Sequence, residues 1–281
     1  MTLFYLIAPV LMSIILYDVI RSFNKKDGIY EKKDLLTNIS IGIIGFILAG
    51  LIKKLLEFIF FIFLFELTLT TRQHLLGYET LGWSWWIWIL AVFGDDFTYY
   101  WHHRWSHSIR LLWAAHVVHH SSKYFNFSTG LRNGWVVLLY KHFWWIWMPI
   151  IGFEPVMITS VLIFNSLYQF AMHIQYNGRY FLPDLIFISP QLHQVHHARD
   201  IQYIDKNYGG FLSIWDRFFG TFEKYDATPE FGITKDIHSN NPFYLHAHEF
   251  LAIARDVRQS KSFRETLLYI FGVPGWQPDK E

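Results

Sequence analysis

The chain of 281 residues contains no cysteine. Disulfide bonds, iron–sulfur clusters, thiolate-bound zinc and thiolate-bound haem are therefore excluded, and histidine and carboxylate remain as the protein ligands a metal could use. Charge is also scarce, because charged residues make up only 17% of the sequence and the formal net charge is +1. A nearly neutral chain gives no electrostatic reason to expect nucleic acid as a partner.

The sequence is rich in apolar residues and poor in charged ones. Hydrophobic residues make up 52% of the sequence and aromatic residues 20%, which is too apolar for an ordinary soluble domain of this length. A helix needs about 20 residues to cross the hydrocarbon core. Five apolar runs are of about this length or longer: 3–20, 39–69, 83–101, 134–151 and 155–171. We therefore expect an all-α, polytopic membrane protein with about four to five transmembrane helices.

The sidedness of these spans follows from the basic residues. The first run lacks a basic start and a small-residue cleavage site, so we expect a retained anchor and not a signal peptide. The run 39–69 carries Lys53 and Lys54 and fits one tilted or broken helix or a shallow re-entrant pair. The positive-inside rule places Lys25, Lys26, Lys32 and Lys33 in the cytoplasm. Counting the spans from there puts the three histidine motifs described next on the cytoplasmic side.

Fifteen histidines are present, and eight of them form three motifs. These are His103-x3-His107, His116-x2-His119-His120 and His193-x2-His196-His197. Residues i, i+3 and i+4 share one face of a helix, so each motif presents imidazoles side by side. A single histidine on an apolar face is usually an ordinary core or interface residue, but eight of them without a common partner would leave many ring nitrogens unpaired. Imidazole suits iron, zinc, copper or nickel, and we expect a site for two ions.

Three classes of function remain open from the residues alone. An oxygenase would use redox-active metal to oxidise unactivated C–H bonds. A zinc-type membrane hydrolase would use metal-activated water and a nearby glutamate as base, but the motifs contain no glutamate. A metal transporter would need ionisable residues at mid-membrane depth, where Lys53 and Lys54 are the only charge pair within a span. The oxygenase fits best.

Longer runs around the motifs carry a family resemblance. The runs DFTYYWHHRWSH (96–107) and LWAAHVVHHSS (112–122) resemble the fatty acid hydroxylase and sterol desaturase superfamily of membrane di-iron enzymes. The runs NFSTGLR (126–132), DKNYGG (205–210), WDRFFGTF (215–222) and GIT (232–234), followed by Asn241-Pro242, are similar to the alkylglycerol monooxygenase branch and its bacterial relatives. The resemblance extends over residues 34–249, although Lys123 stands where that branch usually carries glutamate.

The resemblance implies a metal centre and its surroundings. The implied ligands are the eight motif histidines and one histidine of the returning hairpin: His103, His107, His116, His119, His120, His173, His193, His196 and His197. Asp96, Arg104 and Asn126 are candidates for the residues around these ligands. The implied cofactors are two iron ions. The reductant is either a tetrahydropterin or an external electron-transfer protein, because the His-Pro-Gly-Gly stretch of a fused cytochrome b5 domain is absent.

The resemblance also implies a reaction and a domain plan. We expect an O2-dependent monooxygenase that hydroxylates a lipid alkyl chain of a fatty acyl, sterol or ether lipid; desaturation is the alternative, and metal-dependent hydrolysis the less favoured one. We expect an N-terminal transmembrane anchor and basic loop (1–33), a catalytic domain (34–250) and a C-terminal tail (251–281). A helical cap on the cytoplasmic side should carry the metal site.

Overall fold

The computed structural model describes residues 2–176, 178 and 180–278, with the side chains of 2–8, 11 and 50–58 left aside, so Lys53 and Lys54 lie outside the described side chains. Apart from two isolated β-bridges, the regular structure of the described residues is helical, which confirms the all-α class. The longer helices are α1 (Thr2–Lys25), α2 (Lys32–Leu56), α5 (Trp85–Ser108), α6 (Arg110–His120), α9 (Pro155–Met172) and α12 (Pro242–Gln259).

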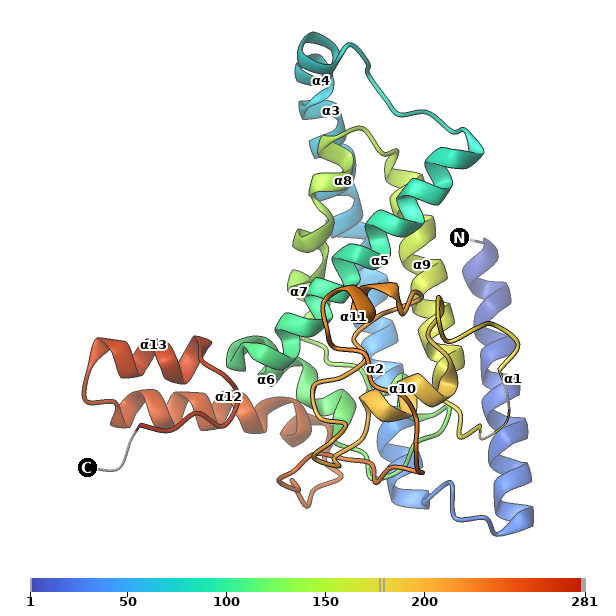
Figure 1. The fold of residues 1–281 in the computed structure, drawn as a ribbon, viewed down its shortest axis with the longest axis vertical. Helices are drawn as coiled ribbons and strands as arrows, with labels where there is room; N and C mark the ends of the chain where they lie inside the picture. The colour runs from blue at the N-terminus through green and yellow to red at the C-terminus, as the bar shows by residue number, and fades with distance from the viewer. Residues whose placement is uncertain (1, 177, 179, 279–281) are drawn as a thin grey trace.

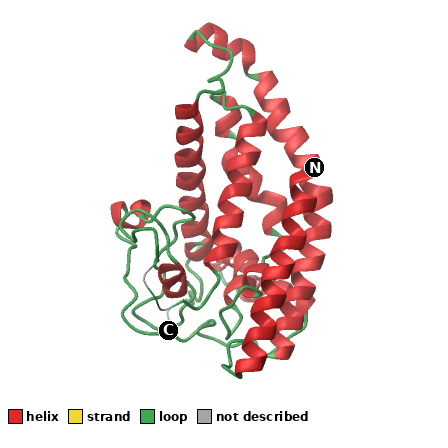
Figure 2. Ribbon diagram, turned by 90° about the vertical axis from the view of Figure 1, so that its right-hand side faces the viewer, coloured by secondary structure: helices red, strands yellow, loops and turns green. Residues whose placement is uncertain are grey.

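Short helical segments join these helices. They are η1 (Glu57–Ile62), α3 (Phe63–Leu67), α4 (Leu69–Leu76), η2 (Thr129–Leu131), α7 (Val137–Tyr140), η3 (Lys141–Trp145), α8 (Trp147–Ile150), α10 (Pro190–His196), α11 (Ile214–Phe218) and α13 (Phe263–Phe271). Most of the long helices run along the long axis of the molecule, and the α12–α13 pair projects to one side (Figure 1). The loops around α10 and α11 gather at one end of the bundle (Figure 2).

The second apolar run folds as one long helix. α2 passes directly into the π-helical segment η1 and then into α3, so the chain stays helical from residue 32 to residue 67. The segments Ile59–Leu67 and Leu69–Leu76 meet at a bend of 44°. The bend lies at the C-terminal end of the run 39–69 and does not divide it.

An aromatic and aliphatic core holds α5, α8, α9 and η1 together. Its buried members are Phe61, Ile87, Ala91, Tyr99, Trp145, Met148, Phe153, Met157, Ile158 and Val161. α5 is 24 residues long, which corresponds to about 36 Å. Its N-terminal half lies in this core and its C-terminal half carries the first histidine motif, so the core fixes the position of that motif.

The expected span 134–151 is not one helix. It is divided into α7, η3 and α8. Two of its tryptophans donate their indole N–H groups to side chains of α5: Trp145 to Asp95 Oδ1 (2.7 Å) and Trp147 to Thr98 Oγ1 (2.9 Å). Buried indole N–H groups require such partners, and these side-chain anchors accompany the irregular backbone.

α9, in contrast, is continuous. Pro155 occupies its first turn, where a missing N–H costs nothing. Among the helices with fully described residues, α9 alone is long and apolar enough to cross a membrane, and the bent pair near residue 68 adds at most one further span. The structure therefore does not confirm the expected number of four to five transmembrane helices.

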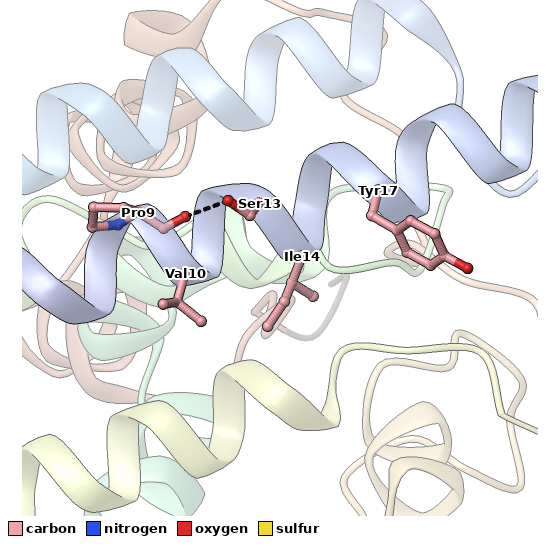
Figure 3. A pocket seen from close by; sticks show the side chains of 5 residues that line it. All are labelled: Pro9, Val10, Ser13, Ile14 and Tyr17. Carbon is pink, nitrogen blue, oxygen red and sulfur yellow. Dashed lines mark hydrogen bonds between the residues drawn. The ribbon is translucent and has the colours of Figure 1, made fainter.

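The first helix, α1, contains a proline and carries a hollow on its surface. α1 contains Pro9 in its interior, and Ser13 Oγ donates to the Pro9 carbonyl at 2.8 Å. A hollow of about 400 Å³ lies on this helix, lined by Pro9, Val10, Ser13, Ile14 and Tyr17 (Figure 3).

The C-terminal part of the chain consists of the helices α12 and α13, which end at residue 271. The expected domain boundary at residue 250 falls within α12.

Candidate metal centre

Three helices carry the histidine motifs. The first motif lies in the last turns of α5, and the second lies in α6, which begins after the single extended residue Ile109. The third motif begins in α10 and ends at its C-cap residue His197. The start of α10 is marked by Ser189, whose Oγ accepts a hydrogen bond from the Leu192 N–H at 3.3 Å, as helix N-caps do. Pro190 follows in the first turn. Local sequence signals thus fix each motif on a helix end.

The nine expected histidines lie together in two groups. In each group the nearest ring nitrogens are all within 4.8 Å of one another. The five-histidine group consists of His103, His107, His116, His120 and His196. The four-histidine group consists of His119, His173, His193 and His197. His102, which the motif spacing left aside, belongs to neither group; it packs against Trp144 and Trp145.

The groups do not coincide with the motifs. In α6, His116 and His120 belong to the five-histidine group, whereas His119 belongs to the four-histidine group. The third motif is divided in the same way. His193 and His197, at i and i+4, belong to the four-histidine group, and His196 at i+3 belongs to the five-histidine group. Each of these two helices therefore contributes to both groups.

Backbone carbonyls determine which ring nitrogens are free in the four-histidine group. Nδ1 of His119 faces the Arg132 carbonyl at 3.1 Å, and Nδ1 of His173 faces the Gln169 carbonyl at 2.8 Å. A carbonyl only accepts, so both Nδ1 atoms carry the proton and both Nε2 atoms carry a lone pair. These two Nε2 atoms are 3.4 Å apart. Two lone pairs at this distance are compatible only with a proton or a cation between them.

The five-histidine group shows the same arrangement. Nδ1 of His103 faces the Tyr208 carbonyl at 2.9 Å, and its Nε2 lies 3.2 Å from Nε2 of His116. Three further Nε2 atoms are buried without a hydrogen-bond partner, two in this group and one in the other: those of His107, His196 and His197. Buried polar atoms of this kind call for an explanation. A bound cation in each group provides one, so the donor set fits metal ions.

Electrostatics favour the form of histidine that binds metal. Burial lowers the pKa of His119, His120, His196 and His197 well below the ordinary value, and neighbouring imidazoles lower the pKa values further. These rings are therefore neutral near pH 7. Neutral imidazole is the ligand form, so protons need not be displaced before metal binds.

A cavity of about 920 Å³ reaches one of the two groups. It is lined by segments of α6, α12 and the loop 232–237, and His107, His120 and His196 form part of its wall. All three belong to the five-histidine group. The four members of the other group are all buried and do not line this cavity. The two groups thus differ in their access to solvent.

The three residues expected around the ligands have other contacts. Asp96 accepts hydrogen bonds from the backbone N–H groups of Phe211 (2.6 Å) and Leu212 (3.0 Å) and from the Trp215 indole. It therefore holds the segment 211–215 on α5.

Arg104 and Asn126 also have their hydrogen-bond partners outside the histidine rings. Arg104 donates to the Tyr100 hydroxyl at 3.0 Å. Asn126 donates to the Ile29 carbonyl at 2.9 Å and accepts from Ser128, which ties the loop after α6 to the connection between α1 and α2. Lys123, the departure from the branch pattern, forms an ion pair with Asp236 and is largely exposed.

Sequence reasoning missed residues that orient the histidines. Arg132 presents its carbonyl to His119, and its buried guanidinium is held by Asp34 Oδ1 at 3.0 Å and Asn38 Oδ1 at 2.9 Å. Asp216 accepts from the N–H groups of Tyr208 and Gly209. Arg132 and Asp216 lie within the runs that carry the family resemblance, and an acidic or basic residue inside an apolar stretch was the available signal.

Comparison with known proteins agrees with this geometry. The model of the fatty acid hydroxylase family matches residues 88–221, which contain all nine histidines. The chain is 34% identical over 279 residues to alkylglycerol monooxygenase of Homo sapiens, covering 97% of this chain and 59% of the relative. It is 29% identical over 174 residues to an ornithine lipid hydroxylase of Rhizobium tropici, covering 59% of this chain and 52% of the relative.

A third relative belongs to the desaturases. A Delta(7)-sterol 5(6)-desaturase of Aspergillus fumigatus is 26% identical over 139 residues, covering 48% of this chain and 38% of the relative. The chain thus spans less than two thirds of the length of these relatives, and no solved structure matches it significantly. The family model, the three relatives and the motifs agree: the chain belongs to the fatty acid hydroxylase and sterol desaturase superfamily, on the side of the alkylglycerol monooxygenases.

Proposed function

We propose that this chain carries a di-iron centre that hydroxylates a lipid alkyl chain, using O2 and an external electron donor. The observation that carries the proposal is the pair of histidine groups. Their Nε2 lone pairs point at one another across 3.1 to 3.4 Å, and three more Nε2 atoms lack a partner. Two cations, one in each group, would satisfy all of them.

The chemistry of the donor set leads to the choice of metal. Each group offers four or five neutral imidazoles, which suit iron, copper, nickel or zinc. Iron bound in the two groups would supply the redox chemistry that oxygen activation and C–H oxidation require, whereas zinc has no redox chemistry. The relatives named for monooxygenase and hydroxylase activity support iron over zinc. The set His103, His107, His116, His119, His120, His173, His193, His196 and His197 is therefore proposed as the ligand set.

The protein's own residues orient and enclose this centre. The carbonyls of Arg132 and Gln169 hold the protons of His119 and His173 away from the centre. Phe125 stacks on His173 at 5.5 Å between ring centroids and closes the four-histidine group on one side. Phe125 thus shields that group from water on this side, and water-soluble reactants approach by way of the five-histidine group and its cavity.

The membrane supplies the substrate in this proposal. α9 is the apolar helix that leads to His173, so a lipid alkyl chain alongside it is close to the centre. We propose that the centre lies on the cytoplasmic side. The hydrogen bond from Asn126 to the Ile29 carbonyl brings the loop after α6 against the basic connection 25–33, and this contact supports a common side under the positive-inside rule.

The reductant and the domain plan are part of the same proposal. We propose that residues 34–250 form the catalytic unit and that the electron donor, a tetrahydropterin or a separate electron-transfer protein, acts from outside this chain. The polar cavity beside the five-histidine group supports approach of a water-soluble donor from that side.

Metal analysis and oxygen labelling test the proposal. Protein purified gently from membranes should contain close to two iron atoms per chain. With lipid, an electron donor and ¹⁸O2, it should give a product with one ¹⁸O atom, or an aldehyde derived from that product if an ether carbon is attacked. His120→Ala and His197→Ala should each lower the iron content and the labelled product, whereas His74→Ala, at an exposed position on α4, should change neither.

Other outcomes would assign a different reaction. A new double bond without ¹⁸O would identify a desaturase, which the sterol desaturase relative keeps as the alternative. A product formed equally well under nitrogen, with its oxygen taken from water, would indicate a metal-dependent hydrolase. Full iron occupancy in both histidine variants would disprove the ligand assignment.

A further inference from the structure

A four-residue segment, Asp205 to Tyr208, serves three members of one histidine group. The Asp205 carboxylate lies 3.5 Å from Nδ1 of His107. The Lys206 carbonyl lies 2.9 Å from Nδ1 of His196, and the Tyr208 carbonyl lies 2.9 Å from Nδ1 of His103. We call this segment the 205–208 loop. All three histidines belong to the five-histidine group, so one short loop orients more than half of that group.

The loop has an uncommon backbone. Asp205 has φ of 60° and Asn207 has φ of 54°, so two of four residues are in the left-handed region without being glycine. Asp and Asn tolerate this region better than other residues, but the conformation still has an energetic cost and persists only where the surroundings enforce it. Strained backbone of this kind is concentrated at functional sites.

Contacts on both sides of the loop enforce this backbone. The Asn207 side chain donates to the carbonyls of Leu192 (3.1 Å) and Glu223 (2.7 Å) and accepts from the Glu223 N–H (2.9 Å). Asp216 accepts from the Tyr208 N–H at 2.7 Å. Leu192 directly precedes the third motif, so Asn207 connects the loop to the helix that carries His193 and His196.

Asp205 differs from the rest of the loop. It lies at the wall of the 920 Å³ cavity beside His107, and its side chain is 61% exposed. Unlike His103 and His196, whose Nδ1 atoms face backbone carbonyls at 2.9 Å, His107 has a side-chain carboxylate oxygen facing its Nδ1 at 3.5 Å. This contact can therefore be removed by substitution of an exposed side chain. Alanine at the positive φ of Asp205 adds backbone strain, which Asp205→Asn avoids.

We propose that the 205–208 loop positions the five-histidine group and sets its metal affinity separately from that of the four-histidine group, with Asp205 as the positioning residue for His107. A carboxylate that accepts the Nδ1 proton fixes the tautomer, directs the Nε2 lone pair into the group and increases its basicity. This inference rests on the proposed function only in requiring that both groups bind metal.

The test measures metal binding by the full chain in detergent, without reference to turnover. Purified protein is loaded with Fe²⁺, or with Co²⁺ alone as an optical probe, and the release of bound metal to an excess of chelator is followed. The wild-type chain should hold two ions. Asp205→Ala should release one of the two ions about 10–100-fold faster, which is the usual effect of losing such an acceptor, and should alter the Co²⁺ spectrum of that ion only.

Two further variants isolate the contact. Asp205→Asn keeps an acceptor oxygen without the charge, so its release rate should lie between those of the wild type and Asp205→Ala. Asp226→Ala removes another exposed carboxylate, which pairs with Lys224 at the surface, and should release both ions at the wild-type rate.

The outcomes separate this inference from the proposed function. Release of both ions at the wild-type rate in Asp205→Ala would overturn the positioning role. Equal loss of both ions would also overturn it, because it would mean that Asp205 supports the fold as a whole. A wild-type chain that binds no metal would instead overturn the proposed function, and with it any metal-positioning role.

Discussion

The backbone carbonyl of Arg132 accepts the Nδ1 proton of His119 at 3.1 Å, while the side chain of the same arginine is held by α2. Asp34 Oδ1 and Asn38 Oδ1 accept from its guanidinium at 3.0 and 2.9 Å. A single residue thus connects a helix near the start of the chain to a member of the four-histidine group. The ion pair Asp34–Arg132 is buried, so its loss should be costly.

Asp34→Ala should destabilise the protein strongly. Removing one partner of a buried ion pair leaves the other charge uncompensated and typically costs about 3–5 kcal/mol. Glu230→Ala is the matched control, because Glu230 pairs with Arg199 at the surface and is 71% exposed; exposed pairs contribute about 1 kcal/mol or less. Thermal unfolding in one detergent measures both, and equal midpoints for the two variants would contradict the prediction.

Gly210→Ala should be damaging because the position has no space for a methyl group. A Cβ atom there would lie 2.6 Å from Asn165 Oδ1 and 2.9 Å from Asp96 Oδ1. The segment 211–215 would have to move away from α5, and Asp96 would lose its backbone donors. Overpacking of this kind typically costs about 1–3 kcal/mol. The measurement is the thermal midpoint together with the yield of folded protein.

Gly45→Ala provides the comparison. It lies within α2, and a Cβ there would meet Trp135 at an ordinary 3.6 Å. Alanine is more favourable than glycine in a helix by about 1 kcal/mol, so this variant should be neutral or stabilised. A Gly45→Ala variant that was less stable than Gly210→Ala would show that the close approach at Gly210 is not the determining factor.

Protein stripped of metal should lose stability steeply below pH 6.5. Burial holds the pKa values of His196 and His197 well below the ordinary value, so the unfolded chain binds more protons as pH falls. The stability from these neutral rings is therefore fully present above about pH 6.5 and is lost below it, by about 1.4 kcal/mol per pH unit for each group. Unfolding midpoints between pH 7.5 and 5.5 measure this slope.

His197→Gln should reduce that slope, since glutamine does not titrate. His74→Gln, at an exposed position on α4, should leave the slope unchanged. A stability that does not vary between pH 7.5 and 5.5 in the stripped protein would rule out burial of neutral histidines as its determinant.

Cysteine labelling tests the sidedness, and the absence of native cysteine removes any background. Ser108 follows the first motif and Gln202 follows the third, and both are exposed. Ser108→Cys and Gln202→Cys should be labelled by an impermeant reagent from the cytoplasmic side, and Glu79→Cys, beyond α4, from the opposite side. Labelling of the first two positions from opposite sides would be incompatible with a shared metal centre.

The spacing of the histidines predicted much of the centre. The motif histidines lie on α5, α6 and α10 as expected, except that His197 is the C-cap residue that follows α10. The partition was not predictable, because His119 and His196 cross to the other group through contacts with α9 and α5, far away in sequence. His173 was found only through the family resemblance, since one histidine at the end of an apolar helix has no distinctive local pattern.

The remaining differences have a common physical cause. The run 134–151 has the composition of a span, but indole N–H groups and buried carboxylates form tertiary hydrogen bonds that no local pattern reveals. The same applies to Asp96, whose donors are more than a hundred residues away, and to the 205–208 loop. Polar partners inside an apolar protein are chosen by tertiary contacts, so sequence pattern alone predicts helices better than it predicts the residues that orient ligands.

Because α6 and α10 each contribute histidines to both groups, the helical backbone relates the positions of the two groups. Residues three apart on a helix are displaced by about 4.5 Å along its axis, and in both helices such a step separates a member of one group from a member of the other. The backbone geometry of both helices therefore constrains the offset between the groups. The exchange of one substrate or co-reactant for another of different shape would therefore leave the offset between the two histidine groups unchanged.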